Sequence, residues 1–187
     1  KPSVLELGES DPMIVLNEEK KKKVMSGTIN GRLRNAGQAC TSSKRIIVQE
    51  GIYDEYLKQI TAYVNNMKVG DPTQADTNMG PVSSETALVK LLDQVNQSVE
   101  KGAKIVSGGK RINRDGFFLE PTILTEIKPG MKAYDEEIFG PVVCIWKVKD
   151  AEEALKIAND TPFGLGASIY TKNVELAQKL ARRIDSG

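Results

Sequence analysis

The fold of this 187-residue chain is restricted most by its hydrophobic pattern. The pattern alternates between short apolar runs and stretches in which an apolar residue recurs every three to four positions. Short apolar runs recur along it, most of them rich in Val and Ile as buried strands are. These runs are Val4–Leu7, Met13–Leu16, Arg45–Val48, Lys104–Ser107, Phe117–Leu124, Val142–Val148 and Ala167–Tyr170. Between several of them the apolar residues repeat every three to four positions, which is typical of amphipathic helices. The helical stretches are Tyr53–Met67, Ala87–Val99 and Val174–Ile184.

Strands that alternate with helices predict an α/β domain of three layers, in which helices cover both faces of a mainly parallel sheet. Helix starts agree with this pattern. Asp150 is followed by Glu153 at the capping-box position, and Ser83 and Asn173 are candidate N-caps. Neither an internal repeat nor a low-complexity linker divides the chain, so residues 1–187 are expected to form one domain.

Charge and hydropathy exclude several classes of function. The net charge is +1, which provides no strong field to attract nucleic acid or an anionic membrane. No apolar run approaches the roughly 18 residues that indicate a membrane span. The four lysines at 20–23 are interpreted as an exposed helical face, because Glu18 and Glu19 precede Lys22 and Lys23 at i,i+4 spacing.

The chain has two cysteines and no histidine. Two lone thiols suit a reducing compartment rather than a secreted disulfide scaffold, so a cytoplasmic location is expected. The absence of histidine excludes Cys-His and Ser-His catalytic pairs within the chain. Two separated cysteines cannot supply the four ligands of a usual zinc site, and no metal site is predicted.

Two side chains are candidates for chemistry on local grounds. Cys40 lies in the small, polar stretch 35–43, and it is either a reactive thiol presented on a loop or a buried structural thiol. Glu6 lies inside an apolar run. It either faces solvent on an alternating strand or is partly buried, in which case its raised pKa would suit a general base. Cys144, within the run Val142–Trp146, is interpreted as apolar filler of a buried strand.

No dinucleotide-binding fingerprint is present. Gly164 and Gly166 follow a helical stretch and precede a strand, whereas the fingerprint requires a strand, then glycines, then a helix. A P-loop is also missing. If the protein uses a nucleotide cofactor, residues outside this chain are therefore expected to hold most of its pyrophosphate.

Four segments together resemble the aldehyde dehydrogenase superfamily. In chain order they are Leu5–Gly8, Asn35–Cys40, Glu136–Val142 and Asn159–Leu165. The Gly-Gln-x-Cys motif and the Glu-Glu-x-Phe-Gly-Pro motif are each specific. The resemblance covers essentially the whole chain.

The resemblance implies a role for four residues. Cys40 matches the family's nucleophile, and Glu6 matches the general base that activates water. Glu137 and Phe139 match positions that contact the nicotinamide-side ribose and the ring region of NAD or NADP. The implied reaction oxidises an aldehyde to its carboxylic acid through a thioester on Cys40, and the presence of Glu6 favours the hydrolytic branch of the family over the branch that transfers the acyl group to coenzyme A.

Further expectations follow from the resemblance. Two stretches, Ser10–Leu16 and Lys68–Pro72, are similar to the succinate-semialdehyde dehydrogenase subgroup. The family's cofactor-binding domain should precede Lys1 and an oligomer-forming tail should follow Gly187. The full-length protein is then expected to be a homo-oligomer, and the isolated fragment to be inactive.

One position departs from the family pattern. The family usually has a second glycine after Gly8, whereas this chain has Glu9. If that position needs glycine's backbone freedom, the alternative is a catalytically disabled, aldehyde dehydrogenase-like binding module.

Overall fold

The structure is a computed structural model that describes residues 1–5, 7–17 and 21–187. Its centre is a six-stranded sheet with the strand order β3-β4-β5-β2-β1-β6. The strands are β1 (Pro12–Val15), β2 (Arg45–Gln49), β3 (Lys104–Ser107), β4 (Thr122–Thr125), β5 (Val142–Val148) and β6 (Ser168–Tyr170). All neighbouring strands pair in parallel except β3, which lies antiparallel to β4 at one edge. The mainly parallel sheet predicted from the sequence is confirmed.

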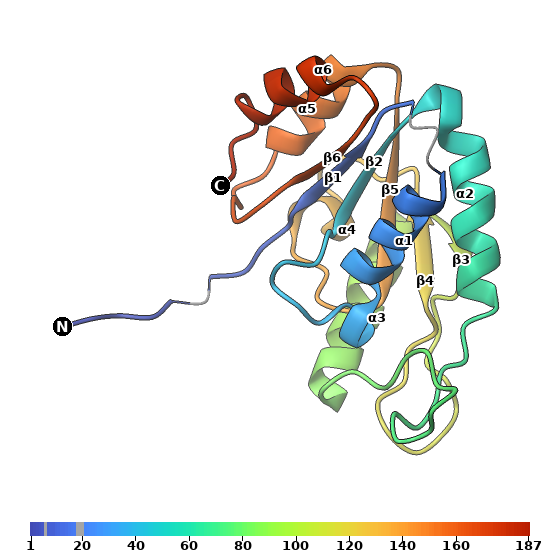
Figure 1. Ribbon diagram of the computed structural model, residues 1–187. Helices are drawn as coiled ribbons and strands as arrows, with labels where there is room; N and C mark the ends of the chain where they lie inside the picture. Colours follow the sequence, from blue (N-terminus) through green and yellow to red (C-terminus); the bar gives the residue numbers. More distant parts are fainter. Residues whose placement is uncertain (6, 18–20) are drawn as a thin grey trace.

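Helices cover both faces of this sheet (Figure 1). They are α1 (Lys21–Arg32), η1 (Arg34–Gly37), α2 (Glu50–Asn65), α3 (Glu85–Glu100), α4 (Lys132–Asp135), α5 (Ala151–Asn159) and α6 (Val174–Ala181). The three long helical stretches predicted from periodicity correspond to α2, α3 and α6.

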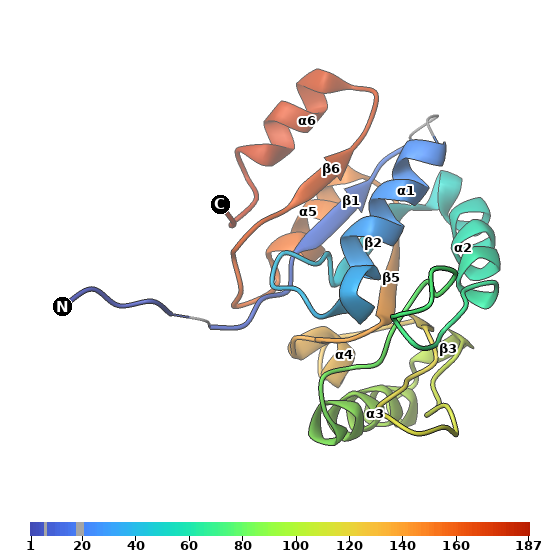
Figure 2. The same cartoon turned by 60° about the horizontal axis from the view of Figure 1, so that its bottom comes forward.

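Two hydrophobic cores lie on opposite sides of the sheet, because successive side chains of a strand point to opposite faces. In β2, Ile46 and Val48 pack with residues of α1 and α2, while Ile47 packs with residues of α3 and α5. β5 alternates in the same way, with Val143 and Ile145 in one core and Cys144 and Trp146 in the other. The result is the three-layer α/β/α arrangement that the alternating pattern predicts, and a second view shows the helical layers on either side of the sheet (Figure 2).

The predicted strand at Val4–Leu7 is wrong for the residues of it that the structure describes. Val4, Leu5 and Leu7 are exposed and lie outside any strand, in an arm that leaves the body of the molecule (Figure 1). Their position has a topological reason. β1, which follows this segment, already has β2 on one side and β6 on the other, so no open strand edge is available beside it.

Two smaller predictions also need correction. The run Phe117–Leu124 is not one strand, because Pro121, which has no N–H to donate to a sheet, interrupts it; β4 begins only at Thr122. The N-cap of α3 is Ser84 rather than Ser83, and its side chain accepts a hydrogen bond from the N–H of Ala87 at 3.1 Å.

The other helix starts agree with prediction. Asp150 caps α5 by accepting from the N–H of Glu153 at 2.9 Å, and Asn173 caps α6 by accepting from the N–H of Leu176 at 2.9 Å. Within the described part of the chain, no helix is long and apolar enough to cross a membrane.

Candidate functional site

The four motif segments come together at one edge of the sheet because of the strand order. The segment that contains Gly8 precedes β1, the segment that contains Cys40 precedes β2, and the last two precede β5 and β6. These four strands are parallel neighbours in the order β5-β2-β1-β6. Segments that enter parallel strands must lie at the edge where those strands begin, so the topology alone gathers the motifs there.

The loop that carries Cys40 has a tightly constrained backbone. After α1 the chain passes through Asn35, Ala36 and Gly37, whose φ angles are 54°, 53° and 71°. A positive φ is unfavourable for residues with a Cβ. A Cβ built on Gly37 would lie only 2.2 Å from the carbonyl oxygen of Gly140, so glycine is required there for close contact as well as for conformation. The Cys40 loop is therefore in close contact with the Glu-Glu-x-Phe-Gly-Pro motif.

Arg32, the last residue of α1, links the same two segments. Its guanidinium is fully buried and donates to the carbonyl oxygens of Val142 at 2.8 Å and Ile138 at 2.8 Å. On the side of the Cys40 loop it donates to the Gly37 carbonyl at 3.3 Å and to Ser42 Oγ at 2.9 Å. Burial lowers the pKa of Arg32 to about 10, which leaves the guanidinium charged at neutral pH.

Lys44 makes a second link, nearer the thiol. Its ammonium group donates to the carbonyl oxygen of Cys40 at 2.6 Å and to that of Ala39 at 2.9 Å. It also pairs with Glu137 Oε1 at 3.1 Å and lies 5.7 Å from the centre of the Phe139 ring. Burial lowers the pKa of Lys44, and the hydrogen bond to Glu137 opposes that shift.

Three of the four predicted site residues therefore lie around one lysine. Cys40, Glu137 and Phe139 are joined through Lys44, and Phe139 is 43% exposed. Gly8 reaches the same place, because a Cβ on it would lie 3.2 Å from Glu137 Oε2. The fourth predicted residue, Glu6, lies outside the described residues.

The two thiols have opposite environments. Cys40 is exposed on its loop, whereas Cys144 is buried in β5. Burial raises the pKa of the Cys144 thiol to about 12, which leaves it protonated and unreactive at neutral pH. Of the two readings that the sequence left open, the structure excludes a buried thiol at Cys40 and bears out the apolar interpretation of Cys144.

Glu9 does not require the conformational freedom of a glycine. The residue with a left-handed backbone is Gly8, with φ of 83°, and Glu9 is not among the non-glycine residues with positive φ. The Glu9 carboxylate accepts a hydrogen bond from the N–H of Leu165 at 3.0 Å, beside Asp11, which accepts from Gly166 at 3.0 Å. Glu9 thus fastens the segment before β1 to the loop before β6.

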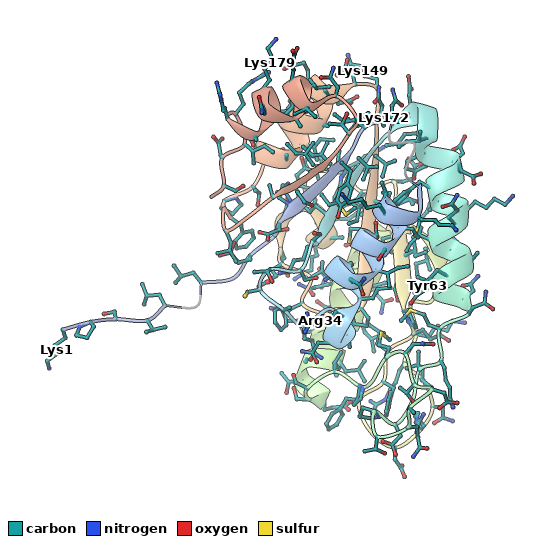
Figure 3. The ribbon with its side chains drawn as sticks, in the orientation of Figure 1. Lys1, Arg34, Tyr63, Lys149, Lys172 and Lys179 are labelled. Carbon is teal, nitrogen blue, oxygen red and sulfur yellow. The ribbon has the colours of Figure 1, made fainter. Side chains whose placement is uncertain are left out.

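An open hollow adjoins the Cys40 loop on the side of α1. Its volume is about 670 Å³, and its lining combines polar and apolar surface in nearly equal parts. Ala39 and Thr41, the two neighbours of Cys40, contribute to it together with the exposed side chain of Arg34, which Figure 3 labels beside the lower end of α1.

Three buried cations, Arg32, Lys44 and Arg45, were not predicted from the sequence. Lys44 and Arg45 directly precede the apolar run of β2, and this position at the start of a buried strand is the one signal that points to them. Arg45 donates to the carbonyl oxygens of Ser10, Ile157 and Ala158 at 2.7, 2.7 and 2.8 Å, and so ties the segment before β1 to the end of α5. Arg32 has no comparable signal, since an arginine at a helix end is usually solvated.

Comparison with known proteins identifies relatives over the whole length of the chain. The model of the aldehyde dehydrogenase family matches residues 1–187. A succinate-semialdehyde dehydrogenase [NADP(+)] of Deinococcus radiodurans is 42% identical over 187 residues, which are 100% of this chain and 39% of that protein. A probable succinate-semialdehyde dehydrogenase [NADP(+)] of Synechocystis is 40% identical, again over 100% of this chain, and 41% of that protein is covered.

Solved structures agree with the sequence matches. The succinic semialdehyde dehydrogenase of Streptococcus pyogenes, in complex with NADP+, superposes with a TM-score of 0.92 and 39% identity over 97% of this chain and 40% of that one. Lactaldehyde dehydrogenase of Escherichia coli superposes with a TM-score of 0.93 and 33% identity over 97% of this chain and 38% of that one. The chain thus spans about two fifths of the length of the relatives that it matches.

Proposed function

Because the chain belongs to the aldehyde dehydrogenase family, we propose that it supplies the thiol-bearing part of an enzyme that oxidises an aldehyde to its carboxylic acid. The observation that carries the proposal is the position of Cys40. It is the exposed thiol of the two, on a loop held by Arg32 and Lys44 against the segment that contains Glu137 and Phe139. A fixed, accessible thiol beside a carboxylate and a half-exposed ring has the parts that this chemistry needs.

Each step of the proposed reaction takes place at the Cys40 sulfur or at the carbon bound to it. The sulfur, as thiolate, adds to the carbonyl carbon of the aldehyde and forms the alkoxide of a thiohemiacetal. Loss of hydride from that carbon restores the C=O bond and gives a thioester. Water then attacks the thioester carbonyl, the carbon–sulfur bond breaks, and the acid and the free thiol are released. The N–H of Cys40 is proposed to stabilise the oxyanion of both tetrahedral species.

Glu6 is proposed as the base that takes a proton from the attacking water. The support for this role is the match of the Leu-Glu-Leu-Gly motif to the family, since Glu6 lies outside the described residues. The carboxylate of Glu137 and the exposed Phe139 ring fit a ribose and a planar ring, and they are proposed to hold the nicotinamide end of NADP. When bound, this cofactor supplies the hydride acceptor. NADP is proposed rather than NAD because relatives at 40–42% identity are named for it.

The proposed substrate is succinate semialdehyde, for two reasons. The relatives from Deinococcus and Synechocystis carry that name. The hollow beside Cys40 also contains the exposed Arg34, whose guanidinium suits the carboxylate of an aldehyde acid. A cytoplasmic location is proposed because a reducing compartment keeps Cys40 as a free thiol. A homo-oligomer is proposed for the full-length protein on the resemblance to the family alone.

The function is tested by following NADPH absorbance with succinate semialdehyde in the full-length protein. We expect Cys40→Ala to lower kcat by at least about a thousandfold, because the nucleophile is removed. Cys144→Ala is the matched control and should keep turnover within a few-fold. Sustained turnover in a folded Cys40→Ala variant would refute the thiol mechanism. Absence of turnover with every aldehyde, in folded wild-type protein, would instead favour the binding module that Glu9 suggested.

Arg34 is tested by substrate selectivity. Removing a charge-assisted hydrogen bond costs about 1.5–3 kcal/mol. We therefore expect Arg34→Gln to lower kcat/KM for succinate semialdehyde by roughly tenfold to a hundredfold, while kcat/KM for butanal, an uncharged aldehyde of equal length, changes less than threefold. Equal losses for the two aldehydes would show that Arg34 does not recognise the carboxylate.

A further inference from the structure

Lys44 stands out among the charged residues because its ammonium group is almost completely enclosed. The side chain is 1% exposed. A protonated lysine has three hydrogens to donate. It has an acceptor for each of them in the carbonyl oxygens of Ala39 and Cys40 and in Glu137 Oε1. The three hydrogens of this buried ammonium group are therefore all directed at the loop that carries Cys40 and at one carboxylate.

The two sides of this arrangement differ in their freedom to move. Ala39 and Cys40 offer main-chain carbonyls on a loop that Gly37 and Arg32 hold in place. Glu137 contributes a side chain that is 19% exposed, and its other oxygen, Oε2, faces Gly8. A ligand that binds Glu137 would alter the carboxylate's charge or position, and it would do so directly next to the cation that holds the carbonyl of Cys40.

A buried cation responds strongly to the loss of a partner. Burial of Lys44 disfavours its charged form, and Glu137 is the carboxylate that offsets this most. When one partner of such a pair is withdrawn, the buried charge that remains is uncompensated, which is strongly destabilising. The Lys44 ammonium group must then move or rely more on its other acceptors. The contacts that remain to Lys44 are the carbonyls of the two peptide groups that flank the α-carbon of Cys40, so any adjustment is transmitted to the backbone of the nucleophile.

We propose that Lys44 is a positioning residue that couples the occupancy of Glu137 to the placement of the Cys40 thiol. The proposal rests on the proposed function, in which Glu137 contacts the cofactor and Cys40 is the nucleophile. A ligand at Glu137 then alters the reactivity of the thiol, and modification of the thiol alters the equilibrium affinity for that ligand. The enzyme would thus sense at the thiol whether its cofactor is in place.

The coupling is measured as the rate of Cys40 alkylation by iodoacetamide in the full-length protein, without cofactor. Lys44→Met, Glu137→Gln and the double variant form a double-mutant cycle. We expect each single variant to change the rate at least threefold and the double variant to resemble one of the single variants, because both remove the same link. Effects that multiply independently, or rates within twofold of wild type, would overturn the proposal.

Lys149→Met is the matched control. Lys149 is exposed and lies at the far end of the molecule from Arg34, as Figure 3 shows. Combined with Glu137→Gln, it should give purely multiplicative effects. If Lys44→Met does not fold, Glu137→Gln alone decides the matter from the accessible side of the pair, since an unchanged alkylation rate in that variant would contradict the link.

A merely structural lysine is distinguished by two further readouts. In wild-type protein, saturating NADP+ should change the alkylation rate by a larger factor than it does in Lys44→Met, where steric protection alone remains. In steady state, Lys44→Met should lower kcat at least tenfold with KM for the aldehyde within threefold, and Lys44→Arg, which keeps the charge, should recover part of kcat. A lowered denaturation midpoint with an unchanged cofactor effect would reject the proposal, while turnover in Cys40→Ala would reject the proposed function separately.

Discussion

At the scale of single residues, the position of Cys40 depends on neighbours that do no chemistry themselves. Gly37 allows the loop to contact Gly140, and Arg32 bonds both segments with a fully buried guanidinium. Lys44 then holds the carbonyl of Cys40 itself. The thiol is therefore placed by backbone contacts, and these leave its side chain accessible.

Gly37 provides a test of that placement. An alanine there would have both an unfavourable φ and a clash with the Gly140 carbonyl. Gly130 isolates the first effect, since its φ is 86° and a Cβ on it meets nothing within 4 Å. We expect Gly130→Ala to cost about 1–2 kcal/mol of unfolding free energy in urea denaturation with no change in Cys40 alkylation. Gly37→Ala should cost more and should change that alkylation rate, and equal behaviour of the two variants would contradict the close contact.

At the scale of elements, the sequence predicted most strands and helices because their hydrophobic periods are clear. The runs Lys104–Ser107 and Val142–Val148 match β3 and β5 at both ends. The failure at Val4–Leu7 has a different origin. A β-like composition does not reveal whether a neighbouring strand edge is free, and that depends on where β6 pairs, which lies more than 150 residues further along the chain.

The N-cap of α3 shows the same limit on a smaller scale. Ser83 and Ser84 are adjacent and chemically identical, and only the backbone geometry selects Ser84. We expect Ser84→Ala to lower the unfolding free energy by about 1 kcal/mol. Ser83→Ala is the matched control and should change it by less than about 0.5 kcal/mol, since the contact of Ser83 with Gln38 uses its main-chain N–H. Equal losses in urea denaturation would show that the cap is misassigned.

At the scale of the whole molecule, the candidate site follows from topology more than from any one motif. Four segments precede four strands, and the parallel order of those strands brings the segments to one edge of the sheet. The sequence predicted Cys40, Glu137 and Phe139 through their motifs. It did not predict Lys44 or Arg32, because a charged residue is expected to face solvent unless the tertiary structure shows what encloses it.

Glu9 was the main reason to consider a disabled protein, and the structure weakens that reason. Its carboxylate accepts from the N–H of Leu165, and the left-handed backbone belongs to Gly8. The residue fastens two motif segments to each other. The departure from the family pattern therefore replaces a glycine with a tether and does not introduce backbone strain.

The central claim is that Cys40 carries the acyl group during turnover, and acid-quenched mass spectrometry of the full-length protein tests it most directly. The protein is mixed with succinate semialdehyde and NADP+, quenched within the first turnovers, and digested. We predict a succinyl thioester on the peptide that contains Cys40, absent when NADP+ is omitted, and more abundant in Glu6→Gln because hydrolysis of the thioester is slowed. NADPH formation without an acyl group on Cys40, or with the succinyl group on Cys144, would contradict the account.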